Sequence, residues 1–326
     1  MNYVINSIVR KTTKGNKPFN ILTTATHESF ETNWCKAHMQ AFALNADGYK
    51  DWNHQFRKLP KNYYILPRAQ TNFKEDLNKQ VIAFIQTIPK DISFDCVVIQ
   101  NNYATHNILS AIAQHLSIPT IEIQHCLPPE NSPKYFLDEM KAKTTNKKVF
   151  ITDYSRERWG YNKDEAIVIR HMTDANLFYP DRTNQNNHIL TVANEYKDRD
   201  YFLGYTLYEE VTKNLPRKNI GNCPGLSEAA KNVEELVQGY QKSTVFLNTS
   251  LISPVPMSLL EAATAGCAIV TTATAEIPFF FTHGENALMS NNPKELRKFC
   301  IDLMNNEQER IRLGDNARKM TLEKMF

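Results

Sequence analysis

Short apolar runs and longer amphipathic segments follow one another along this chain. Residues 19–26, 95–100 and 118–124 are short runs rich in apolar and β-branched side chains, as expected of strands buried on both faces of a sheet. Residues 73–88 and 103–116 repeat their apolar positions with helical spacing. Because strand and helix patterns alternate, the sequence predicts an α/β fold with doubly wound parallel sheets.

The pattern continues beyond residues 160–185, which we interpret as a linker. In the first half, the pattern of residues 28–53 is less regular. We predict a helix over residues 28–45 and a strand at 48–53. In the second half, strands are expected at 188–193, 244–247 and 267–270, and helices at 201–212, 227–240, 257–265, 293–305 and 308–326.

Residues 248–272 contain the most informative local pattern. Here the predicted strand 244–247 leads into a turn that Ser253 can cap, and Pro256 suits the first position of the next helix. Such a strand–turn–helix unit points free backbone N–H groups beyond the strand ends, where an anion binds well. Glu261 could then accept hydrogen bonds from a ribose diol. An ordinary βαβ unit with Glu261 on a solvated face stays equally open.

Two histidines occupy the corners where predicted strands end. His27 directly follows the first strand, and His125 closes the strand 118–124. Ligands of open α/β sheets gather at this edge, so both are candidate catalytic residues. A packing or surface role is the alternative for His27, and it is the interpretation that we prefer for His38.

Composition limits the class of protein. The chain has 326 residues, 42% of them hydrophobic, and a mean hydropathy of −0.47, which is typical of a soluble protein with two domains. No apolar run is long enough for a membrane span, the N-terminus does not resemble a signal peptide, and the six cysteines lack metal-site spacing. These features predict a cytoplasmic protein.

Charge is distributed unevenly along the chain. The net charge is +3, but residues 1–170 contain 22 basic and 16 acidic residues and are therefore basic on their own. A basic first half favours an anionic partner such as nucleic acid, a lipid surface or a phosphorylated glycan. This half is also rich in aromatic residues and lacks an amphipathic membrane anchor, which favours a soluble or polyanionic partner.

The segment between about residues 150 and 286 resembles the nucleotide-sugar signature of retaining family 4 glycosyltransferases, which belong to the glycosyl transferases group 1. Glu261 matches the second glutamate of their motif, whereas Ser253 stands at the first, and Pro254 and Pro256 stand where glycines are usual. The resemblance implies a GT-B fold of two Rossmann-like domains facing a cleft. We expect an acceptor-side domain at 1–165, a nucleotide-sugar domain at 166–311, and a final helix, 312–326, that crosses back to the first domain.

The resemblance also implies roles for particular residues. Glu261 would hold the ribose, while Lys197 and Arg199 would neutralise the donor diphosphate, on which negative charge grows as the glycosidic bond breaks. A surface charge cluster is the alternative for this pair. The further donor-binding candidates are Asn194, Gly221, Ser253, Met257, Ser258, Thr272 and Thr274.

The resemblance therefore implies a glycosyltransferase, specifically a hexosyltransferase. It would move a sugar from a UDP- or GDP-linked donor to a hydroxyl acceptor with retention of configuration, without a cofactor or a metal ion. The acceptor would be a glycan or a hydroxymethylated DNA base. Two alternatives stay open: an epimerase or hydrolase of nucleotide sugars, and a non-catalytic protein that binds nucleotide sugars or nucleic acid.

Overall fold

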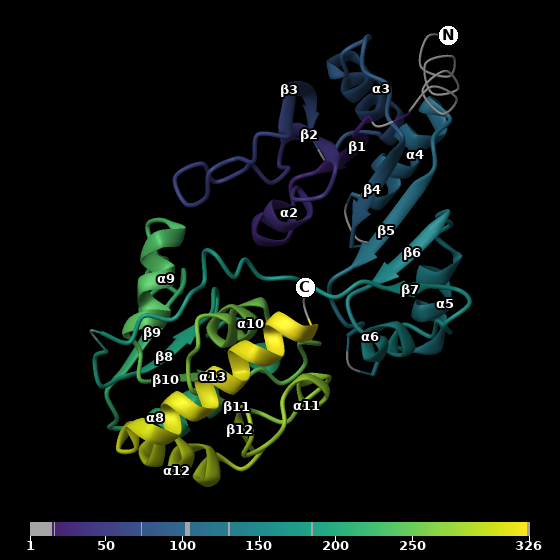
Figure 1. Ribbon diagram of the computed structural model, residues 1–326. Helices are drawn as coiled ribbons and strands as arrows, with labels where there is room; N and C mark the ends of the chain where they lie inside the picture. The colour runs from purple at the N-terminus through teal and green to yellow at the C-terminus, as the bar shows by residue number, and fades with distance from the viewer. Residues whose placement is uncertain are drawn as a thin grey trace. The chain divides into compact units, whose positions relative to one another are not determined.

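The computed structural model describes residues 15, 17–72, 74–101, 105–129, 131–183 and 185–324. The polar and basic segment 11–17, which its composition predicts to be flexible, lies mostly outside these ranges. The chain divides into two compact units whose boundary falls between Ile169 and Arg170 (Figure 1). This boundary lies close to the predicted one at 165/166.

The first unit is built on a seven-stranded sheet. Its strand order is β3-β2-β1-β4-β5-β6-β7, and each neighbouring pair is parallel. The strands are β1 (Phe19–Thr24), β2 (Met39–Asp47), β3 (Tyr63–Asn72), β4 (Cys96–Gln100), β5 (Thr120–Gln124), β6 (Lys147–Phe150) and β7 (Ile167–Val168). The helices are α2 (Glu28–Trp34), α3 (Leu77–Thr87), α4 (His106–Leu116), α5 (Lys134–Ala142) and α6 (Asp153–Arg158).

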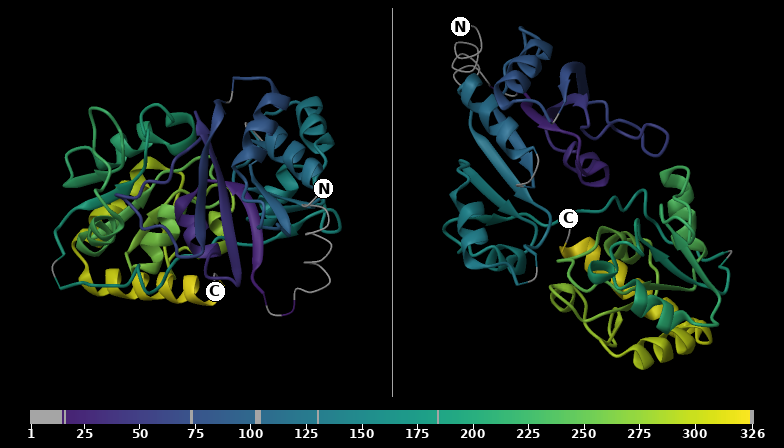
Figure 2. Two further views of the ribbon diagram at one scale, coloured as in Figure 1. Left: turned by 90° about the horizontal axis from the view of Figure 1, so that it is seen from above. Right: turned by 180° about the vertical axis from the view of Figure 1, so that it is seen from behind.

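Burial on both faces explains the continuous apolar runs of this sheet. Leu22, Val97 and Ile99 pack in the core that α3 and α4 cover, while Ile21 and Val98 pack in the core on the opposite face. Helices α3 and α4 lie side by side against the sheet (Figures 1 and 2). After β3 the chain moves to the other side of β1, so the winding reverses between β1 and β4.

The predicted helix over residues 28–45 and the predicted strand at 48–53 are wrong. Helix α2 ends at Trp34, and Met39–Asp47 instead forms β2 between β1 and β3. The sequence Ala-Phe-Ala-Leu in this segment suits a helix by intrinsic propensity, which misled the prediction. In the structure all four of these side chains are buried in the sheet, so tertiary packing overrides local preference.

The second unit has a five-stranded parallel sheet of order β12-β11-β10-β8-β9. Its strands are β8 (Ile189–Val192), β9 (Arg217–Ile220), β10 (Val245–Asn248), β11 (Ile269–Thr271) and β12 (Leu288–Met289). Its helices are α7 (Asp200–Leu203), α8 (Tyr205–Thr212), α9 (Val233–Lys242), α10 (Met257–Thr264), α11 (Ile277–Phe280), α12 (Pro293–Met304) and α13 (Glu307–Lys324). The winding of this sheet reverses between β8 and β10.

Two predicted helix starts are wrong: the start of the helix expected at 227–240, for which Ser227 has the chemistry of a cap, and the first helical position expected at Pro256. Helix α9 starts after Asn232, whose side chain accepts a hydrogen bond from the Glu235 N–H, whereas Ser227 donates to the Gly221 carbonyl. Helix α10 starts after Pro256, which is the N-cap itself and contributes no side-chain hydrogen bond. Its other end agrees with the prediction: Gly266 follows the helix with φ of +74°, a conformation that glycine adopts without strain.

Helix α13 packs along α10 in the second unit (Figures 1 and 2). Leu313, Ala317 and Met320 of α13 are buried, and the Arg318 guanidinium donates to the Phe178 and Thr264 carbonyls. The sequence predicted that residues 312–326 cross back to the first domain, whereas helix α13 belongs to the second compact unit. No helix within the described ranges is both long and apolar enough to cross a membrane.

Candidate active site

The first unit brings His27 and His125 together at the carboxyl end of its sheet. Their ring centroids lie 4.6 Å apart in an edge-to-face arrangement, and the Phe30 ring lies 4.7 Å from that of His125. His27 follows β1, His125 follows β5, and β4 lies between these two strands. The two candidate catalytic histidines therefore flank the point where the winding of the sheet reverses, which is where open α/β sheets bind ligands.

A buried carboxylate organises this corner. Glu31 of α2 is fully buried, and its Oε1 accepts hydrogen bonds from the Thr26 N–H at 2.8 Å and the His27 N–H at 3.3 Å. The Gln100 side chain of β4 also donates to Oε1, and the Tyr63 hydroxyl donates to Oε2 at 3.2 Å. A buried carboxyl group is costly unless it is hydrogen-bonded, and these donors supply the required partners.

The ionisation of this corner follows from its surroundings. His27 keeps an exposed surface, yet desolvation by the neighbouring protein and, secondarily, the positive charge of Lys50 lower its pKa to about 4. His27 is therefore neutral near pH 7. Desolvation by burial raises the pKa of Glu31 above its usual value, although its hydrogen bonds to Gln100, Thr26 and His27 act in the opposite direction.

In the second unit, the loops after β8 and β9 are joined by hydrogen bonds. The Asn222 N–H donates to the Asn194 side chain at 2.8 Å, and the Glu195 N–H donates to the Asn222 carbonyl at 2.8 Å. The Lys197 ammonium donates to the Gly225 carbonyl at 3.2 Å. Three predicted donor-binding or catalytic positions, Asn194, Lys197 and Gly221, thus belong to one pair of adjoining loops.

Gly221 is required for this approach of the two loops. Its φ is +151°, and a Cβ atom built at this position would lie 1.8 Å from the Ala193 carbonyl oxygen. No side chain fits in that space. The structure therefore gives Gly221 a backbone role in shaping the loop, and a contact with the donor stays a prediction.

The two cations predicted to hold the diphosphate lie on the segment that leads into α7. Lys197 is exposed and half-buried Arg199 is the N-cap residue of α7, with its guanidinium carbon 5.1 Å from the centre of the Phe202 ring. Asp198 and Asp200 flank Arg199 in an Asp-x-Asp sequence, but Asp200 accepts hydrogen bonds from the Thr206 N–H and hydroxyl. Among the described residues no group of three or more metal-ligating side chains is arranged to hold a metal ion.

Thr272 and Thr274 follow β11, the strand next to β10 in the sheet. Both hydroxyls donate to the Ser250 carbonyl, at 2.6 and 2.7 Å, and Thr272 is buried. These contacts fix the loop after β10 against the loop after β11. Ser253, Met257 and Ser258 follow in half-buried positions where α10 begins. Because the first N–H groups of a helix have no intrahelical partner and Pro256 offers no side-chain cap, this end of α10 is suited to an anion.

Glu261 is buried, with 5% of its surface exposed, so the solvated position considered from the sequence is wrong. Its Oε2 accepts a hydrogen bond of 3.0 Å from the Tyr240 hydroxyl of α9. Burial and the neighbouring Glu261 carboxylate raise the pKa of Tyr240 well above its usual value, so the phenol stays protonated and donates. Tyr240 was not identified from the sequence, because its position in the middle of a helix carries no local sign of a polar partner.

Comparison with known proteins identifies the architecture. Residues 228–320 match the family model for glycosyl transferases group 1. Among solved structures, HepE from Anabaena, determined with UDP and glucose, is 12% identical with a TM-score of 0.70, covering 94% of this chain and 95% of HepE. Sucrose-phosphate synthase from Thermosynechococcus elongatus is 13% identical with a TM-score of 0.69, covering 95% of each chain. No curated protein matches in sequence.

The chain has the GT-B glycosyltransferase fold. A glycosyltransferase from Rickettsia africae ESF-5 is also similar, with 12% identity and a TM-score of 0.63 over 94% of both chains. The matched segment of the group 1 model includes Glu261, Ser253, Thr272 and the start of α10. The GT-B fold predicted from the sequence is thereby confirmed, whereas membership of family 4 and the role of each site residue stay predictions.

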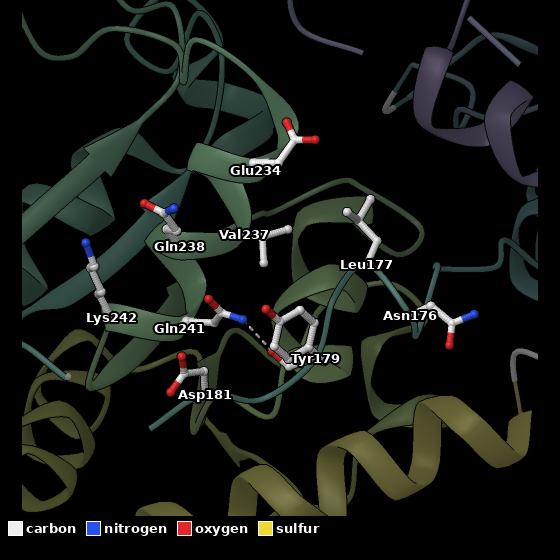
Figure 3. Close-up of a pocket in the computed structure, with 9 residues that line it drawn as sticks. All are labelled: Asn176, Leu177, Tyr179, Asp181, Glu234, Val237, Gln238, Gln241 and Lys242. Atoms are coloured by element: carbon white, nitrogen blue, oxygen red, sulfur yellow. Dashed lines mark hydrogen bonds between the residues drawn. The ribbon is translucent and has the colours of Figure 1, made fainter. Parts of the chain in front are cut away.

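A separate pocket of about 470 Å³ lies in the second unit of this GT-B chain, between α9 and residues 176–181 (Figure 3). Gln241 donates to the Tyr179 carbonyl at 3.0 Å, while Glu234 lies at the other end of the helix face (Figure 3). None of the predicted site residues lines this pocket. Its polar side chains are spread over α9 and residues 176–181, and we assign the pocket no role in catalysis.

Proposed function

We propose that this chain is a glycosyltransferase that uses a UDP-linked hexose and transfers the sugar with retention of configuration. The observation that carries the proposal is the match of residues 228–320 to glycosyl transferases group 1, because this segment contains Glu261 and the uncapped start of α10. UDP is favoured over GDP because the structure of HepE, which shares the fold, was determined with UDP and glucose and also with UDP-glucose.

The donor would be bound by loops at the carboxyl end of the second sheet. We assign the diphosphate to the N–H groups of Met257 and Ser258, where the positive end of the α10 dipole favours an anion. Glu261 would accept hydrogen bonds from the ribose hydroxyls. This role requires the carboxylate to share its acceptor capacity between the ribose and Tyr240, which a carboxylate's two oxygens allow.

In the transfer step, the acceptor oxygen forms a bond to the anomeric carbon while the bond from that carbon to the phosphate oxygen breaks. The acceptor proton passes to the departing phosphate oxygen, so no protein nucleophile is needed for attack on the same face. Negative charge grows on the UDP diphosphate during this step. Lys197 and Arg199 would stabilise that charge more strongly in the transition state than in the bound donor.

Further donor contacts are assigned to Asn194, Gly221, Ser253, Thr272 and Thr274. Because Ser253 replaces the first glutamate of the family motif, sugar recognition there would use a hydroxyl and not a carboxylate. His27 and His125 would orient hydroxyl groups of the sugar or the acceptor. His27 suits such a role because, being neutral near pH 7, it can both donate and accept a hydrogen bond. The proposed reaction uses no cofactor or metal ion.

A screen of UDP- and GDP-sugars by thermal shift and slow hydrolysis tests the proposal. A bound donor raises the melting temperature by an amount that grows with the logarithm of its concentration divided by its Kd, and hydrolysis reveals catalysis in the absence of an acceptor. We expect one UDP-hexose to do both, with activity unchanged by a metal chelator. A product that is an isomeric nucleotide sugar would favour an epimerase, and binding without any turnover would favour a binding protein.

The acceptor class requires a second experiment. If the acceptor is a DNA base, double- or single-stranded DNA should bind at low salt and lose affinity steeply as salt rises, because basic residues displace condensed counterions. The measurement is a titration with each form of DNA at two salt concentrations. No binding at low salt would exclude DNA and leave a glycan as the proposed acceptor.

A further inference from the structure

The hydrogen bonds around Gln100 determine which way its amide faces. Its Nε2 points towards two acceptors, Oε1 of Glu31 and, at 3.4 Å, the Thr24 carbonyl. The opposite orientation would place the amide oxygen against both of these oxygens. Oε1 of Glu31 already accepts from the Thr26 and His27 N–H groups, so any proton on this carboxyl belongs on Oε2, beside Tyr63. The orientation of Gln100 therefore holds for either protonation state of Glu31.

This orientation leaves the Gln100 amide oxygen facing His125. The oxygen lies 3.3 Å from Nε2 of the His125 ring, and it can only accept a hydrogen bond. Nε2 must then carry a proton. Both side chains are buried, with 2% of Gln100 and 7% of His125 exposed, so water does not readily replace this partner. The His125 backbone N–H is held as well, by the Asn101 side-chain oxygen at 2.9 Å.

We propose that Glu31 and Gln100 are positioning residues that hold His125 in one tautomer, with the proton on Nε2. Glu31 fixes the orientation of the Gln100 amide, and Gln100 in turn fixes which nitrogen of the His125 ring carries the proton. The second nitrogen of a histidine ring is set by the hydrogen bond that the first one makes. His125 thereby keeps one fixed tautomer at the edge of the sheet where ligands of open α/β folds bind.

The tautomer itself does not depend on the proposed transferase activity. Nitrogen-detected correlation spectra of the full chain with ¹⁵N-labelled histidine distinguish the two neutral tautomers at pH 7.5. Assignment of His125 uses the loss of its signals in His125→Asn. We expect the wild-type ring to be protonated on Nε2. A wild-type ring protonated on Nδ1, or a rapid mixture of both forms, would overturn the proposal.

Variants then test the two positioning residues. Gln100→Leu removes the acceptor, and Glu31→Leu frees the Gln100 amide to turn; each should reduce the ratio of the two tautomers by about tenfold, the worth of one hydrogen bond. Glu31→Gln keeps an oxygen that can occupy the Oε1 position, so it should preserve the wild-type tautomer. If either leucine variant does not fold, Gln100→Met removes the same acceptor with an unbranched chain.

Gln124→Leu is a matched control. Gln124 is also a 2% exposed glutamine at the end of a neighbouring strand, but it donates to Glu122 at 3.0 Å and not to Glu31. Its loss should leave the His125 tautomer unchanged. If Gln124→Leu shifts the tautomer as much as Gln100→Leu, the effect is general damage to the core and the assignment of Gln100 is wrong.

An activity measurement follows if the proposed transfer is observed. Gln100→Leu should lower kcat/KM by about tenfold while UDP affinity, which we assign to residues of the second unit, stays unchanged. Unchanged kcat/KM in a variant that has lost the tautomer preference would show that the fixed tautomer has no part in transfer. Absence of any transferase activity would refute the proposed function but leave the spectroscopic result intact.

Discussion

Replacing Glu261 with glutamine separates its proposed contact with the ribose from its contact with Tyr240. The carboxylate is buried, and Tyr240 donates to its Oε2 at 3.0 Å. In Glu261→Gln the amide oxygen can still accept from the tyrosine, so the internal hydrogen bond survives. The amide has lost the negative charge and half of its acceptor capacity, however, and a ribose diol needs both.

The expected magnitudes follow from the hydrogen bonds involved. A hydrogen bond to a charged group is worth about 1.5–3 kcal/mol, so UDP affinity should fall by roughly 10- to 150-fold in Glu261→Gln. The free energy of unfolding should change by only about 1 kcal/mol, because the Tyr240 bond becomes a neutral one. Tyr240→Phe should show the opposite balance: it leaves a buried acceptor with one donor fewer and costs about 1–3 kcal/mol of stability.

Calorimetric titration with UDP and denaturant unfolding, performed on both single variants and on the double variant, provide the measurement. If Tyr240 helps to orient Glu261 towards the ribose, the effects on affinity will not be additive. Glu210→Gln is the control, since Glu210 is an exposed carboxylate of α8. UDP affinity that is the same in Glu261→Gln and wild type would refute the ribose assignment and leave Glu261 as a structural partner of Tyr240.

Three further outcomes are expected. Arg199→Ala and Lys197→Ala should each reduce kcat by about 100-fold and donor affinity much less, as measured by steady-state kinetics and by titration with the donor. If both variants turn over at the wild-type rate, the diphosphate does not bind at these two cations. Gly221→Ala should lower the free energy of unfolding, measured with denaturant, by about 1–3 kcal/mol from backbone strain and further through the clash with Ala193. Gly284 also has a positive φ, +79°, but open space around a built Cβ, so Gly284→Ala should lower the free energy of unfolding less. Burial lowers the pKa of His27 in the folded chain from 6.5 to about 4, so between these pH values the unfolded chain binds more protons than the folded one. The free energy of unfolding should therefore rise with pH over this range, and His27→Gln should flatten that rise. An unchanged pH dependence in the variant would mean that His27 is solvated.

The β10–α10–β11 unit was predictable because its signals are local. A continuous apolar run marks β10, strong helix formers fill Met257–Thr264, and a glycine follows where the backbone needs positive φ. Local signals of this kind act over a few residues, and the sequence therefore identified half of the strands and most of the longer helices. They also supported the resemblance on which the GT-B prediction rested, and that prediction was confirmed.

Predictions from local sequence failed where contacts with other parts of the fold determine the conformation. The segment Met39–Asp47 contains good helix formers, yet its place between β1 and β3 imposes an extended backbone. Ser227 has the chemistry of a helix cap, but its hydroxyl is used to hold the Gly221 loop, and Asn232 caps α9 instead. In the first case a tertiary contact outweighs a helix propensity of well under about 1 kcal/mol per residue. In the second it outweighs a capping preference of about 1 kcal/mol.

The partners of the candidate site residues were decided by the tertiary structure alone. The sequence indicated that His27 and His125 each end a strand, but their contact depends on β4 being the strand that separates β1 from β5. Glu31, Gln100 and Tyr240 had no local pattern that distinguished them from other polar residues in helices and strands. Hydrophobic periodicity records which face of an element is buried, whereas the order of strands in a sheet determines which strand ends, and so which side chains, meet.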